Sequence, residues 1–65
     1  MRFYRVAYYM LNNRGIKLGS DPVVLCFYSS SILNTEGLPF QRMLLEYGRA
    51  IGRSGSTVEI VSIER

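Results

Sequence analysis

Histidine is absent from this sequence, and cysteine occurs once, at Cys26. A single cysteine excludes a disulfide within the chain, and without histidine it cannot complete the four nitrogen or sulfur ligands of a structural zinc site. No serine has a histidine base, so nucleophilic catalysis also lacks its parts. We therefore expect no metal, and we interpret Cys26 as a small buried apolar residue of a strand.

Acidic residues are few, and a glycine-rich phosphate-binding signature is missing. The five carboxylates are scattered over expected turns, helix and strands without the close pairing that general acid–base catalysis uses: Asp21, Glu36, Glu46, Glu59 and Glu64. We therefore expect no cofactor and no enzymatic activity.

Long apolar runs are lacking as well. The longest such run in the expected strands, Val23 to Tyr28, is far shorter than the roughly 20 residues that a membrane span needs. The N-terminal segment carries Arg5 among its apolar residues and has no small-residue cleavage site, which is not typical of a signal peptide. We expect a cytoplasmic protein without a membrane partner.

The chain has 65 residues and a net charge of +3, with seven arginines and one lysine against five acidic residues. This length predicts one domain, residues 1–65, whose core is small enough that a partner chain would add stability. The positive charge favours an anionic partner, but a charge of this size also serves solubility.

Apolar and β-branched residues predict three strands, Arg2 to Leu11, Val23 to Ser29 and Thr57 to Ile63. Only Pro39 to Ile51 has apolar residues at helical spacing. The sequence therefore predicts an α+β fold of ββαβ order, with a three-stranded, mainly antiparallel sheet and one helix packed on one face.

Turn residues separate these elements. Asn12 to Gly15 is typical of a type I turn that closes a hairpin, after which Ile16 to Leu18 begins the return strand. Gly19 to Pro22 should interrupt that strand with a kink, bulge or loop, because Pro22 cannot donate to a ladder.

The predicted helix has an apolar face and a basic face. The apolar face should cover the core with Phe40, Met43, Leu44, Tyr47, Ala50 and Ile51. Arg42, Arg49 and Arg53 lie opposite, with Leu45 among them as a stray exposed residue or a contact point. Glu46 is spaced to pair with Arg42 or Arg49, which would make this an ordinary solvated face.

A single helix of about 13 residues can cover one face of a three-stranded sheet and no more. Both faces of the first strand are nonetheless apolar, and such a surplus is typical of a partner surface. We therefore expect a homodimer and a protein interface that includes Phe3, Arg5, Tyr9, Leu11 and Tyr28. Alternatively, the connector Ser29 to Leu38 folds back over the second face.

Gly52-Arg53-Ser54-Gly55 resembles the GxxG segment with which KH domains clamp a nucleic-acid backbone. In a KH domain this loop joins two helices, whereas the residues from Thr57 onward favour a strand. We therefore interpret Gly52 and Gly55 as a helix stop and a turn.

Two hypotheses for function follow. In the first, the chain is a small binding protein, a homodimer that acts through protein–protein contact as an inhibitor, adaptor or assembly factor; in size it resembles accessory proteins of phages and mobile elements. In the second, it binds nucleic acid with a basic helix face and the hairpin tip, through Arg42, Arg49, Arg53, Arg14 and Lys17.

Overall fold

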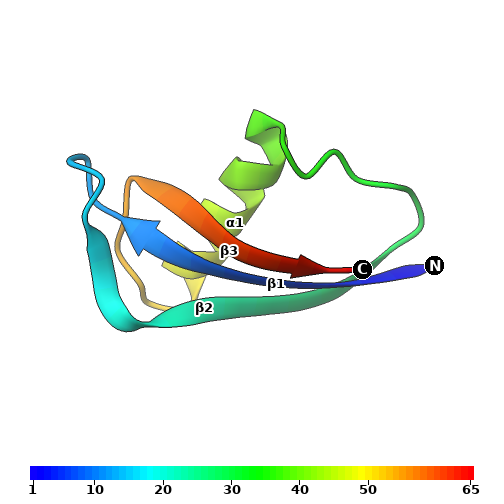
Figure 1. Cartoon of the computed structure of the whole chain (residues 1–65), viewed down its shortest axis with the longest axis horizontal. Helices are drawn as coiled ribbons and strands as arrows, with labels where there is room; N and C mark the ends of the chain where they lie inside the picture. The colour runs from blue at the N-terminus through cyan, green and yellow to red at the C-terminus, as the bar shows by residue number, and fades with distance from the viewer.

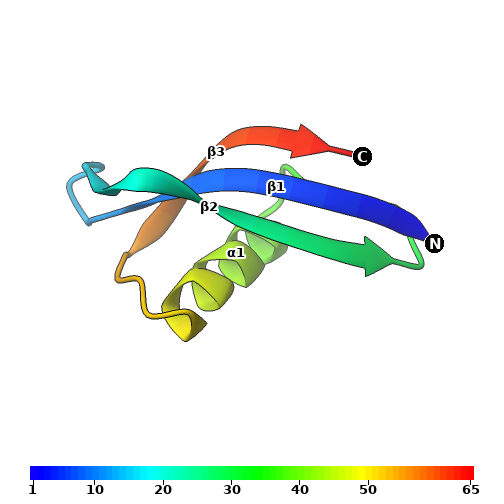
Figure 2. The same cartoon turned by 90° about the horizontal axis from the view of Figure 1, so that it is seen from below.

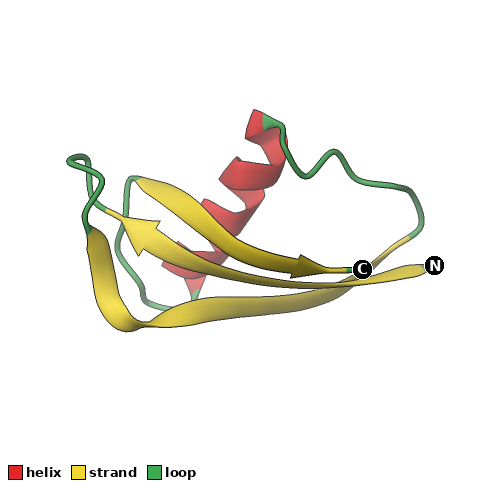
Figure 3. Ribbon diagram, viewed as in Figure 1, coloured by secondary structure: helices red, strands yellow, loops and turns green.

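The computed structural model describes residues 1–65 as one open three-stranded sheet with a helix packed on one face (Figures 1 and 3). The strands are β1 (Arg2–Leu11), β2 (Lys17–Ser29) and β3 (Thr57–Glu64), and the helix is α1 (Leu38–Ala50). The strand order is β2-β1-β3, and both neighbours run antiparallel to the central β1. The predicted ββαβ fold is confirmed.

The β1–β2 hairpin is held by Asn12. Its side-chain oxygen accepts hydrogen bonds from the backbone N–H groups of Arg14 (2.8 Å) and Ile16 (3.0 Å). Gly15 has φ 78°, a left-handed conformation that costs glycine little. The turn is therefore formed by the residues predicted for it, Asn12 to Gly15.

The predicted interruption of the second strand is a bulge within a continuous strand. Tyr8 pairs with Val23 and Met10 pairs with Leu18, so four residues of β2, Gly19 to Pro22, stand opposite one residue of β1. Gly19 has φ 89°, and β2 bends sharply at its hairpin end (Figure 1). The bend carries the N-terminal part of β2 towards the end of α1.

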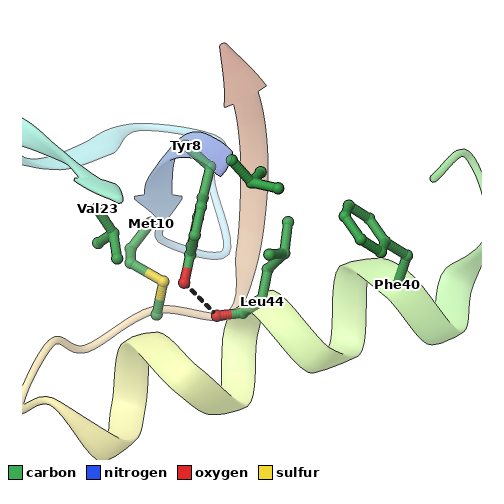
Figure 4. Packing of buried hydrophobic residues seen from close by; sticks show 6 residues of the cluster. Tyr8, Met10, Val23, Phe40 and Leu44 are labelled. Carbon is green, nitrogen blue, oxygen red and sulfur yellow. Dashed lines mark hydrogen bonds between the residues drawn. The ribbon is translucent and has the colours of Figure 1, made fainter. Parts of the chain in front are cut away.

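The core lies between α1 and one face of the sheet. That face is formed in β1 by four side chains that are each at most 1% exposed: Tyr4, Val6, Tyr8 and Met10. Figure 4 shows Tyr8 pointing from β1 to α1, where its hydroxyl donates to the Leu44 carbonyl at 2.6 Å. Burial, with a smaller effect from Tyr47, raises the pKa of Tyr8 to about 12.

The buried stripe of α1 differs from the predicted one. Phe40, Leu44 and Gly48 are its buried residues, and Met43 and Tyr47 pack partly buried against the core as predicted. Ala50, in contrast, is exposed, and Ile51 is 51% exposed. Gly48 lets the helix approach β1 closely, because a Cβ there would lie 2.5 Å from the Met10 sulfur. Relative to the expected orientation, the helix is therefore turned about its own axis, so that Gly48 instead of Ala50 and Ile51 faces the sheet.

This rotation also explains Leu45, which packs half-buried against the core although it stands among charged residues in the sequence. The helix ends at Ala50, and Gly52 follows with φ 93°, as expected of a glycine at a helix stop. No helix of the protein combines the length and apolar character that crossing a membrane requires.

The connector between β2 and α1 stays on the helix side of the sheet (Figure 1). Its Leu33 packs against the core and donates its backbone N–H to the Tyr4 hydroxyl at 3.3 Å. Thr35 is buried and its hydroxyl accepts a hydrogen bond from Arg65 at 3.0 Å. The alternative in which this connector covers the second face of the sheet is therefore wrong.

Candidate interaction surface

The face of the sheet opposite α1 has no element packed on it (Figure 2). Because directly paired residues of neighbouring strands point to the same face, the register defines its members. We call this surface the open face; it consists of Phe3, Arg5, Ala7, Tyr9 and Leu11 of β1, Lys17, Val24, Cys26 and Tyr28 of β2, and Thr57, Glu59, Ser62 and Glu64 of β3.

The open face divides into two halves of different chemistry. The half formed by β1 and β2 carries Phe3, Ala7, Val24, Cys26 and Tyr28, which we call the apolar half. The half along β3 carries Thr57, Glu59, Ser62 and Glu64, which we call the polar half. The predicted apolar residues of the second face come from the first two strands, and the register places them there. In β3 the exposed apolar residue is Val61, which lies at the register shift and has no direct partner in β1.

An aromatic pair dominates the apolar half. Phe3 and Tyr28 stand directly opposite each other, with ring centroids 5.3 Å apart in an edge-to-face arrangement. Phe3 is 42% exposed and Tyr28 is 68% exposed. Both rings thus keep much of their apolar area in water on an uncovered surface.

Cys26 adjoins this pair and is exposed. The interpretation of Cys26 as a buried apolar residue is therefore wrong. The physical reason is its position, because β2 is an edge strand and Cys26 points to the face that no helix covers.

Ion pairs mark the boundary between the two halves. Arg5 donates to Glu64 at 2.7 Å, and Lys17 lies 3.7 Å from Glu59 and 4.5 Å from the centre of the Tyr9 ring. Each pair is exposed and adds little stability, but it holds the long side chains over β1. The apolar half is therefore bordered by charged groups that are already paired.

The structure brings the five predicted interface residues to the same face of the sheet. Phe3 and Tyr28 expose large aromatic surfaces, whereas Arg5 and Tyr9 contact charged residues of the neighbouring strands. Leu11 is only 9% exposed and offers almost no area to a partner. The sequence did not single out Val24, whose exposure follows from its position on the edge strand.

The predicted basic residues do not gather on one surface. Arg49 donates to the Gly55 carbonyl at 2.9 and 3.3 Å, and Arg53, which lies beyond the end of α1, donates to the Asp21 carbonyl at 3.2 Å. Lys17 belongs to the open face, on the opposite side of the sheet from α1. The placement of Arg53 on the helix face is therefore wrong, because the helix stops before it.

Arg42 and Arg14 have no ion pair, and neither does Glu46, so the pairing of Glu46 with Arg42 or Arg49 is not formed. Arg42 lies beside a shallow depression of about 260 Å³ on α1. Arg14 is exposed in the turn between β1 and β2.

Sequence reasoning missed a polar cleft of about 340 Å³ between the β2 bulge and the end of α1. Its lining includes Gly19, Asp21, Gly52 and Arg53, which come together only through the fold. Arg53 crosses the cleft to the Asp21 carbonyl, and the Asp21 carboxylate and the negative end of the helix dipole oppose anion binding there.

No family model, curated protein or solved structure matches this chain. Exposure and chemistry are therefore the criteria for a candidate interaction surface. By these criteria the apolar half of the open face stands out, since it combines aromatic residues, an absence of covering elements and a charged border.

Proposed function

We propose that this chain is a small, non-enzymatic, cytoplasmic binding protein that forms a homodimer and recognises another protein through its open face. The observation that supports this proposal is the uncovered apolar half, with the exposed aromatic pair Phe3 and Tyr28. Its role belongs to the class of inhibitors, adaptors or assembly factors.

The layout of the open face agrees with the usual anatomy of a protein interface. Such interfaces have a core enriched in aromatic residues and a polar rim. Here Phe3, Val24 and Tyr28 would form the core, while the Arg5–Glu64 and Lys17–Glu59 pairs would form part of the rim. Covering a large apolar side chain fully is worth about 1.5 to 3 kcal/mol, so a few anchors suffice for measurable affinity.

A second copy of the chain would also stabilise a domain whose core is small. Only 11 of the 65 residues are buried. Domains of this size gain stability from association, because the buried fraction of their surface is low.

The proposal is tested with variants of the aromatic pair. Phe3→Ala and Tyr28→Ala should each weaken partner binding by at least about tenfold, whereas Ile32→Ala should leave it unchanged. Ile32 is the matched control because it is apolar and 74% exposed but lies in the connector, away from the open face. Affinity capture with the intact chain, followed by titration of the captured protein against each variant, gives the comparison.

If the alanine variants of Phe3 and Tyr28 bind as well as Ile32→Ala, the open face is not the recognition surface. A captured protein that binds all four chains equally would contradict the proposal in the same way.

Nucleic-acid binding is the second candidate function. It is favoured by the net charge of +3 and by Arg42 and Arg14, which have no ion pair. Binding to a phosphate backbone should weaken steeply between about 50 and 200 mM salt, whereas binding through an apolar surface should hardly respond. Arg42→Glu with Arg49→Glu should abolish binding only in this second case.

A further inference from the structure

The side chains of β2 are exposed on both faces of the sheet, in contrast to those of β1. On the helix side Leu25 and Phe27 remain half-buried, and on the open face Val24 is 40% exposed and Tyr28 still more. The equivalent positions of β1 are almost fully buried on the helix side, because β1 has a neighbouring strand on each side. As an edge strand, β2 has no neighbouring strand along its outer side.

The backbone of β2 also has groups without a partner along its outer edge. None of the backbone hydrogen bonds outside the helix and strands involves residues 23–29. In an edge strand every second residue directs its N–H and C=O groups away from the sheet, so a row of these groups in β2 has no backbone partner. The strand from Val23 to Ser29 spans about 23 Å at the usual rise per residue.

The two edges of the sheet differ in their protection against pairing. Proteins usually guard edge strands with charged residues or bulges. The edge strand β3 has Glu59 and Glu64 and a register shift between its pairs with Ala7 and Tyr8. The edge strand β2 has such features only in its first part, Lys17 to Pro22, which holds two charges, a proline and a register shift. The segment Val23 to Ser29 has none of them. Strand pairing is therefore favoured at β2.

We propose that two copies of the chain pair antiparallel along Val23 to Ser29, across a two-fold axis perpendicular to the sheet. The inference rests on the homodimer of the proposed function and specifies how its subunits join. The product is a continuous six-stranded sheet in the order β3-β1-β2-β2-β1-β3. A second copy of the chain can pair with this edge without any matching of charges. In an antiparallel two-fold arrangement the same uncharged strand lies against itself.

This arrangement gives the open face a simple organisation. A two-fold axis perpendicular to the sheet places both helices on one side and both open faces on the other. The two apolar halves then meet at the centre of the dimer, and the polar halves with Glu59 and Glu64 lie at its outer edges. Pairing at β3 would instead place the polar halves at the centre. The β2 pairing therefore creates one large surface with an apolar core and a polar border.

Amide hydrogen exchange followed by NMR tests the pairing in the unaltered protein, at a concentration where sedimentation gives the dimer mass. In an unpaired edge strand, slowly and rapidly exchanging amides alternate along the chain. The pairing predicts slow exchange at consecutive amides from Val24 to Tyr28, while β3 keeps the alternation.

A matched pair of variants adds an independent measurement. Val24 and Ser62 are both exposed on the open face, and both stand opposite Ala7, Val24 in β2 and Ser62 in β3. Val24→Lys places a charge at the proposed pairing edge and should raise the dimer dissociation constant at least about tenfold. Ser62→Lys should leave it unchanged. Circular dichroism checks that both variants fold.

The outcomes separate this inference from the proposed function. A dimer whose β2 amides alternate, or a dimer that Ser62→Lys weakens as much as Val24→Lys, overturns the β2 pairing and leaves the homodimer in place. A monomer mass at all concentrations overturns both. If Val24→Lys fails to fold, the exchange pattern of the unaltered protein decides alone.

Discussion

The two sides of β1 carry side chains of similar chemistry in opposite surroundings. On one side Tyr4, Val6, Tyr8 and Met10 are covered by α1, and the Tyr8 hydroxyl bonds to the helix backbone. On the other side Phe3 stays partly in water beside Tyr28, since no element covers the open face. Aromatic character alone therefore does not make a core residue in this protein. The position of the single helix decides which side stabilises the fold and which is available to a partner.

The largest effect on stability is expected for an alanine substitution on the helix-covered side. Leu44 is fully buried against Tyr8, so Leu44→Ala should lower the free energy of unfolding by about 2 to 5 kcal/mol. Urea unfolding followed by circular dichroism gives the value. A loss below about 1 kcal/mol would show that α1 does not cover this side as described.

High pH should lower the free energy of unfolding, because Tyr8 on the helix-covered side loses its proton. Because the pKa of Tyr8 is raised to about 12 from its ordinary value of 10.0, the folded state favours the neutral hydroxyl. The stabilisation is fully present below pH 10 and is lost as the pH rises through about 12, for a total of about 2 to 3 kcal/mol.

The matched control for this pH effect is Tyr8→Phe, which should unfold more easily at neutral pH by about 1 to 2 kcal/mol through loss of the bond to Leu44. The variant should lack that part of the loss of unfolding free energy at high pH which Tyr8 causes. Identical alkaline transitions in the two proteins would disprove the role assigned to Tyr8.

The smallest effect is expected on the open face, although the residue changed is larger. Phe3→Ala removes more apolar area than Leu44→Ala but mainly loses a cross-strand contact with Tyr28, so the free energy of unfolding should fall by only about 0.5 to 1 kcal/mol. The same urea titration measures it. A loss as large as that of Leu44→Ala would mean that Phe3 is a core residue and would remove the contrast between the two sides.

Local patterns in the sequence were sufficient to predict the elements of the fold. The helical spacing after Pro39, the Asn12 to Gly15 turn and the interruption before Val23 all lie where periodicity and turn chemistry place them. Each of these signals depends on neighbours along the chain, which a single sequence shows directly.

Features that depend on distant neighbours were not predictable. Both faces of β1 are apolar, so the alternation could not show which one α1 covers. The close approach of Gly48 to Met10 rotates the buried stripe of the helix, and helical spacing alone contains no such information. The exposure of Cys26 follows from strand order, and the position of Arg53 follows from the helix end.

The most direct test of the proposal that the uncovered strands join two copies of this chain is the mass of the protein in solution. Sedimentation equilibrium at micromolar concentrations should give twice the chain mass of 7.4 kDa, with dissociation on dilution. A mass of 7.4 kDa throughout the concentration range would contradict the proposal that the uncovered strands join two copies of this chain.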